Sequence, residues 1–81
     1  MTYYRNSTED EPFRLRVYRK SELARLYFPD ASTATALQTL NRWINRCPAV
    51  REGLRDMGYD KYRKHFLKPE VELIISQLGE P

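Results

Sequence analysis

Residues 21–44 place the strongest constraint on the fold of this chain, because they contain two amphipathic runs separated by a proline and a short polar turn. Apolar side chains recur at helical spacing over residues 23–28, and Pro29 ends that run because a proline ring does not fit inside a helix. Ser21 is the expected N-cap, since its hydroxyl can accept a backbone N–H. Residues 30–32 form the expected turn. The pattern therefore predicts a helix, a turn and a second helix.

The second run has one apolar face and one polar face. The apolar face consists of Ala36, Leu37, Leu40, Trp43 and Ile44, and we expect Trp43 to lie in the core. The polar face consists of Thr35, Gln38, Thr39, Arg42, Asn45 and Arg46. These side chains are of the types that meet base edges and phosphates when the second helix of a helix-turn-helix enters a major groove. A solvated helix face has the same composition, so the pattern also fits a helix pair that only packs.

The remaining segments predict a small ribbon and two further helices. Residues 1–12 are polar without an apolar period, which predicts a flexible tail. Alternation over residues 13–18 predicts a strand with Phe13, Leu15 and Val17 inward, and a second strand is expected to place Phe66 inward. One helix should start at Pro48, carry Val50, Leu54 and Met57 on one face, and end at Gly58; another should start at Pro69 and end at Gly79. The predicted fold is a mainly helical α+β, winged helix-turn-helix-like domain over residues 13–81, with four helices and a two-stranded antiparallel ribbon.

Composition limits the classes of function. The chain has 81 residues and a net charge of +3, and its basic residues gather at 14–25 and again in Lys61, Arg63, Lys64 and Lys68. Such clusters suit a polyanion, although a solvated charged surface gives the same pattern. No apolar run approaches the ~20 residues that span a bilayer, and the start lacks the apolar core of a signal peptide, so we expect a soluble, cytoplasmic protein without membrane contact.

The sequence offers no recognisable catalytic or cofactor site. The single cysteine, Cys47, excludes an internal disulfide, and the single histidine, His65, has no nucleophile in a familiar arrangement nearby. Metal-ligand spacing and a glycine-rich phosphate loop are absent from the sequence. We therefore expect a non-enzymatic protein without a cofactor.

A set of motifs resembles a known family. The motifs are ELA-x-x-YFP at residues 22–29, A-x-x-x-L-x-x-WI at 36–44, Gly58-Tyr59, and the ending with Ile74-Ile75 and LGEP at 78–81. Together they resemble a family of small Bacteroidales proteins known as domain of unknown function 4248. The resemblance implies this architecture and a bacterial source, but no established activity. This chain has Lys68 where the family usually has a threonine before the proline, so the last helix is expected to be frayed or capped by another group.

These observations predict a DNA-binding accessory or regulatory protein. Its architecture is loosely similar to the winged helix-turn-helix modules of excisionase and MerR-type regulators, with the basic turn before the second strand as the wing. The candidate site consists of Thr35, Gln38, Thr39 and Arg42 toward the bases and of Arg46, Lys61, Arg63 and Lys64 toward the phosphates. The alternative is a protein interaction module that uses the same Tyr- and Arg-rich surface. As a DNA-binding protein, a module this small would need a homodimer or a partner for useful specificity.

Overall fold

The computed structural model describes residues 13–81, and the tail expected at residues 1–12 lies outside the described residues. In chain order the elements are β1 (Tyr18–Arg19), α2 (Lys20–Tyr27), α3 (Thr33–Arg46), α4 (Pro48–Asp56), β2 (His65–Phe66) and α5 (Lys68–Leu78). The described part is therefore a mainly helical α+β unit with four helices and a two-stranded antiparallel ribbon, as predicted.

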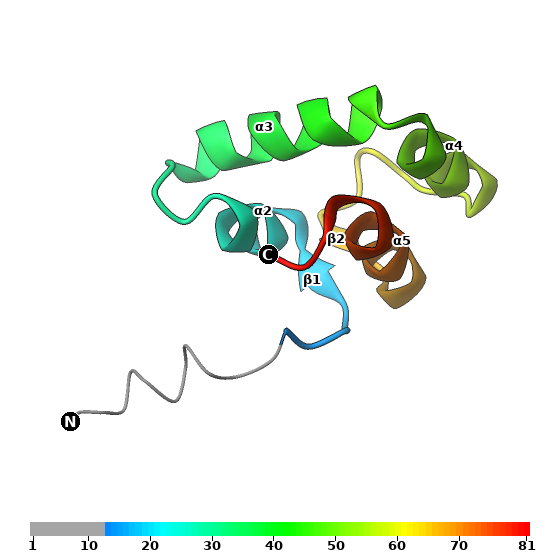
Figure 1. Cartoon of the computed structure of the whole chain (residues 1–81), viewed down its shortest axis with the longest axis horizontal. Coiled ribbons are helices and arrows are strands. Elements are labelled where there is room, and N and C mark those ends of the chain that lie inside the picture. Colours follow the sequence, from blue (N-terminus) through cyan, green and yellow to red (C-terminus); the bar gives the residue numbers. More distant parts are fainter. Residues whose placement is uncertain (1–12) are drawn as a thin grey trace.

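The first two helices are strongly crossed. Figure 1 shows α2 nearly end-on beneath α3, which runs lengthwise across the molecule. The helix α2 ends at Tyr27, before Pro29, and α3 begins after Ser32, whose Oγ accepts the backbone N–H of Thr35 at 3.2 Å. The predicted cap at Ser21 is wrong. Because β1 runs directly into α2, Arg19 is the N-cap and Ser21 lies inside the helix.

The ribbon is shorter than the sequence suggests, and its inward face differs. Only two residue pairs form it, Tyr18 with Phe66 and Arg19 with His65. Tyr18 is 3% exposed and Val17 is 45% exposed, so the predicted inward position of Val17 is wrong. A bend at Arg16 shifts the alternation by one residue, and the Tyr18 ring then stacks on Phe13 with 5.4 Å between centroids.

The core lies between all the helices and the ribbon. Its buried members are Tyr18, Leu23, Ala24, Ala36, Leu40, Ile44, Val50, Leu54, Phe66, Val71 and Ile74. The helix α4 approaches α5 closely at Gly53, where an added Cβ would lie 2.6 Å from Cδ2 of Leu73. Met57 follows the end of α4 and is exposed, so its predicted place on the apolar face with Val50 and Leu54 is wrong.

Trp43 does not lie in the core. The residue is 39% exposed, and its ring packs in T-shaped pairs with Phe28 and Tyr27, with 4.8 and 6.4 Å between ring centroids. The position is on the flank of the apolar stripe, and the end of α2 covers only one side of the ring. Trp43 therefore contributes less burial than the predicted central position would give.

The start of α5 has an unusual cap. Leu67 is the N-cap residue, and its backbone N–H donates to Oε1 of Glu70 at 2.8 Å. The Glu70 carboxylate thus supplies the half of a capping box that reaches back to the N-cap residue, and its negative charge also suits the positive end of the helix dipole. Leu67 has no side-chain oxygen that could accept a first-turn N–H as a Ser or Thr would. The helix begins at Lys68, one residue before the predicted start at Pro69, so Lys68 is not the N-cap. The other capping group that was expected is Glu70, which acts on Leu67.

Candidate nucleic-acid interface

The outward face of α3 is exposed and free of carboxylates. Gln38, Arg42 and Arg46 are all exposed, and Asn41 and Asn45 extend the polar surface on one side. The helical repeat places Gln38 and Arg42 one turn apart, opposite the buried stripe that starts at Ala36. No Asp or Glu occurs between Thr33 and Arg46, so the whole helix carries only positive formal charge.

Two predicted contact residues on α3 make local hydrogen bonds. Oγ1 of Thr35 accepts from Oγ of Ser32 at 3.0 Å, within the cap of the helix. Oγ1 of Thr39 donates to the carbonyl of Thr35 at 2.8 Å, and Thr39 is half-buried. Both hydroxyls are therefore already engaged, which leaves Gln38, Arg42 and Arg46 as the predicted contact residues with long side chains on this helix.

The last six residues between α4 and β2, residues 59–64, are here called the basic loop. Asp60 closes it as a turn, since Oδ1 of Asp60 accepts the N–H of Tyr62 at 2.8 Å and the carbonyl of Asp60 accepts the N–H of Arg63 at 3.1 Å. Nζ of Lys20 donates to the carbonyls of Asp60 and Lys61, each at 3.1 Å. These bonds fix the loop to the start of α2, while Tyr62 in the loop is 83% exposed.

Lys20 and Tyr59 contact each other where the basic loop begins. Nζ of Lys20 lies 4.4 Å from the centroid of the Tyr59 ring, a cation–π contact. Burial, followed by repulsion from Arg63, lowers the pKa of Lys20 below its usual value. Burial likewise raises the pKa of Tyr59 to about 12, so the phenol stays neutral at physiological pH.

Arg63 has an internal partner rather than a free side chain. Its Nη2 lies 2.6 and 2.7 Å from the two carboxylate oxygens of Glu70, and its Nε donates to the carbonyl of His65 at 3.1 Å. The Glu70 side chain is only 3% exposed. A phosphate contact by Arg63 would therefore require breaking a largely buried ion pair, whereas Lys61 and Lys64 are exposed and have no ion-pair partner within residues 13–81.

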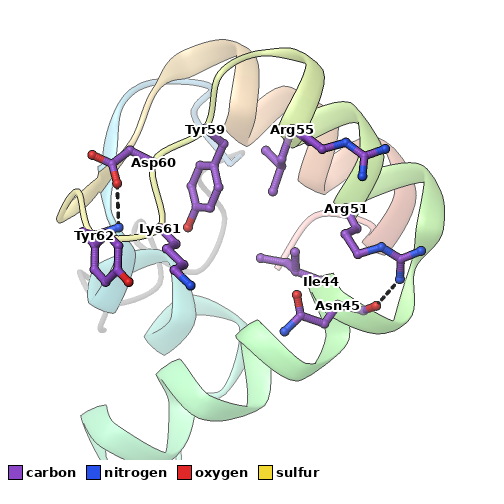
Figure 2. Close-up of a pocket in the computed structure, with 9 residues that line it drawn as sticks. Ile44, Asn45, Arg51, Arg55, Tyr59, Asp60, Lys61 and Tyr62 are labelled. Atoms are coloured by element: carbon purple, nitrogen blue, oxygen red, sulfur yellow. Dashed lines mark hydrogen bonds between the residues drawn. The ribbon is translucent and has the colours of Figure 1, made fainter.

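A groove of about 450 Å³ separates the basic loop from the helices. Figure 2 shows Tyr59, Lys61 and Tyr62 on one side and Ile44, Asn45, Arg51 and Arg55 on the other. The depression continues toward Lys20 and Asn41. The structure thus places Lys61 beside the polar flank of α3, while Arg63 is held against α5.

Four polar residues of this groove were missed as site candidates. Asn41 and Asn45 on α3, and Arg51 and Arg55 on α4, each form a pair four residues apart and so share a helix face. That spacing is visible in the sequence. What the sequence did not reveal is that both faces border the same groove, because this depends on how α3 and α4 pack.

Two further observations cover the part of the chain that the structure describes. No group of three or more His, Cys, Asp or Glu side chains is arranged to hold a metal ion in this part of the chain. In the same region no helix combines the length and apolar character needed to cross a membrane. What the described surface offers is hydrogen-bonding amides, exposed cations and an exposed tyrosine.

Comparison with known proteins gives one family. No curated protein and no solved structure matches the chain. The family model for a domain of unknown function, DUF4248, matches residues 14–81, which include every helix and strand described above. The match starts within the first residues that the structure describes and covers most of the chain, so the protein belongs to the DUF4248 family.

Proposed function

We propose that this protein is a non-enzymatic DNA-binding accessory or regulatory protein with a winged helix-turn-helix-like mode of binding. In this proposal α2, the turn and α3 form the helix-turn-helix, α3 enters the major groove, and the basic loop acts as the wing. The strongly crossed packing of α2 and α3 supports it, because helix-turn-helix pairs cross at a large angle. The likeness to excisionase and MerR-type modules is one of architecture only.

One observation carries the proposal: the exposed, carboxylate-free face of α3 lies beside a cation of the basic loop. Lys61 borders the same depression as Asn41 and Asn45 of α3. A wing next to a recognition helix can hold phosphates while the helix reaches base edges. An acidic residue on α3 would repel the duplex, and none is present.

The roles follow from exposure and reach. Gln38 and Arg42 point directly outward and have the bidentate groups that suit adenine and guanine, respectively. Arg46, Lys61 and Lys64 are exposed cations for phosphates. The hydroxyls of Thr35 and Thr39 already bond within α3 and its cap, so Thr35 keeps its O–H and Thr39 keeps only its oxygen lone pairs for a contact with DNA.

The proposal also covers the assembly state of the protein, its source and its cellular compartment. A single module of this size buries too little surface for high specificity, so a homodimer or a partner protein would share the site. The family resemblance to Bacteroidales proteins suggests a bacterial source, and the single cysteine fits a reducing cytoplasm.

Replacing both Gln38 and Arg42 with alanine tests this proposal. We expect the preference for a selected duplex over random duplex to fall by about 1 to 3 kcal/mol per lost base contact, while non-specific binding persists through the other cations. Folding should be nearly unchanged, because exposed helix positions usually shift stability by less than about 0.5 kcal/mol. The measurement is selection from a random duplex pool, followed by anisotropy titration of the enriched duplex.

The matched control replaces Gln77 and Lys68 on α5, which are also an exposed glutamine and an exposed cation. This control should keep the preference of the wild type. If the wild-type protein enriches no sequence, or if both double variants lose preference equally, base reading by α3 is contradicted.

A further inference from the structure

The groove between the basic loop and α4 has an apolar floor. Ile44 and Leu54 form its base, and the half-buried ring of Tyr59 forms one wall. A floor of this kind gains little from a phosphate backbone, but it gains from an apolar side chain that displaces water. The volume of about 450 Å³ suits one or two such side chains rather than a rigid duplex.

The rim of the groove is positively charged. Arg51, Arg55 and Lys61 border it, and the acidic residue in the lining is Asp60. Oδ1 of Asp60 already accepts the N–H of Tyr62, as the dashed line in Figure 2 shows. Arg55 and Lys61 have no ion-pair partner among residues 13–81, so two cations remain available for carboxylates.

The exposed tyrosine at the rim is held on a rigid support. The loop that carries Tyr62 is closed by Asp60 and tied to Lys20, and Nζ of Lys61 lies 5.2 Å from the Tyr62 ring centroid. Pre-organisation lowers the entropy that binding would otherwise cost. Tyrosine and arginine are also the residue types that dominate interface hot spots.

We propose that this groove binds a short acidic segment of a protein partner. An aliphatic or aromatic side chain of that segment would lie on the floor of Ile44 and Leu54, and carboxylates on either side of it would pair with Arg55 and Lys61. The Asn45 amide lines the groove on the side of Arg55 and can bond to the backbone of the segment. Lys61 is shared with the proposed DNA contacts but Arg55 is not, so the inference does not rest on DNA binding and Arg55 can test it separately.

The test uses the full chain and a displayed library of random dodecapeptides. The proposal expects enriched peptides with at least two carboxylates close to an apolar residue. An enriched peptide, labelled with fluorescein, is then titrated by anisotropy. Arg55→Glu should weaken its binding by about tenfold or more, because an acidic residue would then face the carboxylates. Tyr62→Ala should weaken it by a similar factor if Tyr62 is a hot spot.

The matched control is Lys68→Glu, which changes the net charge by the same amount at an exposed position on α5, outside the groove. Its affinity for the peptide should equal that of the wild type. Circular dichroism checks that each variant is folded. Three outcomes of these measurements would overturn the proposal: no enrichment, enrichment of peptides without carboxylates, or equal weakening by Arg55→Glu and Lys68→Glu. A fourth would be that single-stranded oligothymidine displaces the peptide and that its own binding depends on Arg55 and Tyr62. The last outcome would assign the groove to unpaired bases. The Arg55→Glu variant is also titrated with a duplex. If its affinity for the duplex equals that of the wild type, a failure of the peptide proposal can be told apart from a failure of the proposed DNA binding.

Discussion

Phe66→Ala is expected to lower the free energy of unfolding by about 3 to 5 kcal/mol, because it removes a large buried ring and leaves a cavity. Phe66 is fully buried, pairs with Tyr18 across the ribbon, and stacks on Tyr59 with 5.8 Å between ring centroids. Phe66 thus connects the ribbon to Tyr59, the first residue of the basic loop. A chain of 81 residues has a total stability of roughly 4 to 12 kcal/mol at typical values per residue, so this variant should lose a large fraction of its stability.

The matched control is Leu67→Ala, at the neighbouring position, where the side chain is exposed. We expect a loss of about 1 kcal/mol or less there, since Leu67 is 43% exposed and so removes much less apolar area from water than the fully buried Phe66 does. Urea unfolding followed by circular dichroism measures both variants. Similar midpoints for the two would mean that Phe66 does not fill the core in this way.

Arg63→Ala is expected to cost about 2 to 4 kcal/mol of stability, because it leaves the largely buried Glu70 carboxylate without its charged partner. This expected loss is smaller than the largest losses measured for fully buried ion pairs, since the Arg63 side chain is 29% exposed and water screens the pair in part. Lys64→Ala, at the adjacent exposed cation, should have almost no effect on stability. The contrast separates a structural arginine from the exposed lysine beside it in the same basic loop.

A second variant tests the cause. Adding Glu70→Gln to Arg63→Ala should restore part of the lost stability, because the neutral amide no longer needs a cation and its oxygen can still accept the N–H of Leu67. Thermal or urea unfolding of both variants measures the recovery. If the double variant is less stable than Arg63→Ala alone, an unpaired charge is not the source of the cost.

The order and type of the elements could be predicted because local signals mark the ends of the helices. Pro48 is the first residue of α4, and Gly58 follows that helix with a positive φ of 77°. The inward position of Phe66 is also confirmed. In contrast, the predicted inward position of Val17 on the first strand was wrong. The chain bends at Arg16, which shifts the alternation by one residue, and such a bend depends on tertiary packing.

The candidate site was less predictable because its geometry comes from contacts between distant segments. Periodicity placed Trp43 on the apolar stripe, but only the packing of α2 shows that this flank of α3 is half covered. Arg63 resembles its neighbours in the basic loop, and only the fold brings the first turn of α5 against it. The groove likewise requires α3, α4 and the loop to be placed together.

The most direct test of DNA binding is the salt dependence of affinity for a random duplex, measured by fluorescence anisotropy for the wild type and for Lys61→Ala with Lys64→Ala. Binding through phosphates releases counterions, so the logarithm of the wild-type affinity should fall linearly and steeply with the logarithm of salt concentration. The double variant should bind every duplex more weakly, with a slope flatter by about two. No duplex binding at low salt, or an affinity that does not respond to salt, would contradict the account.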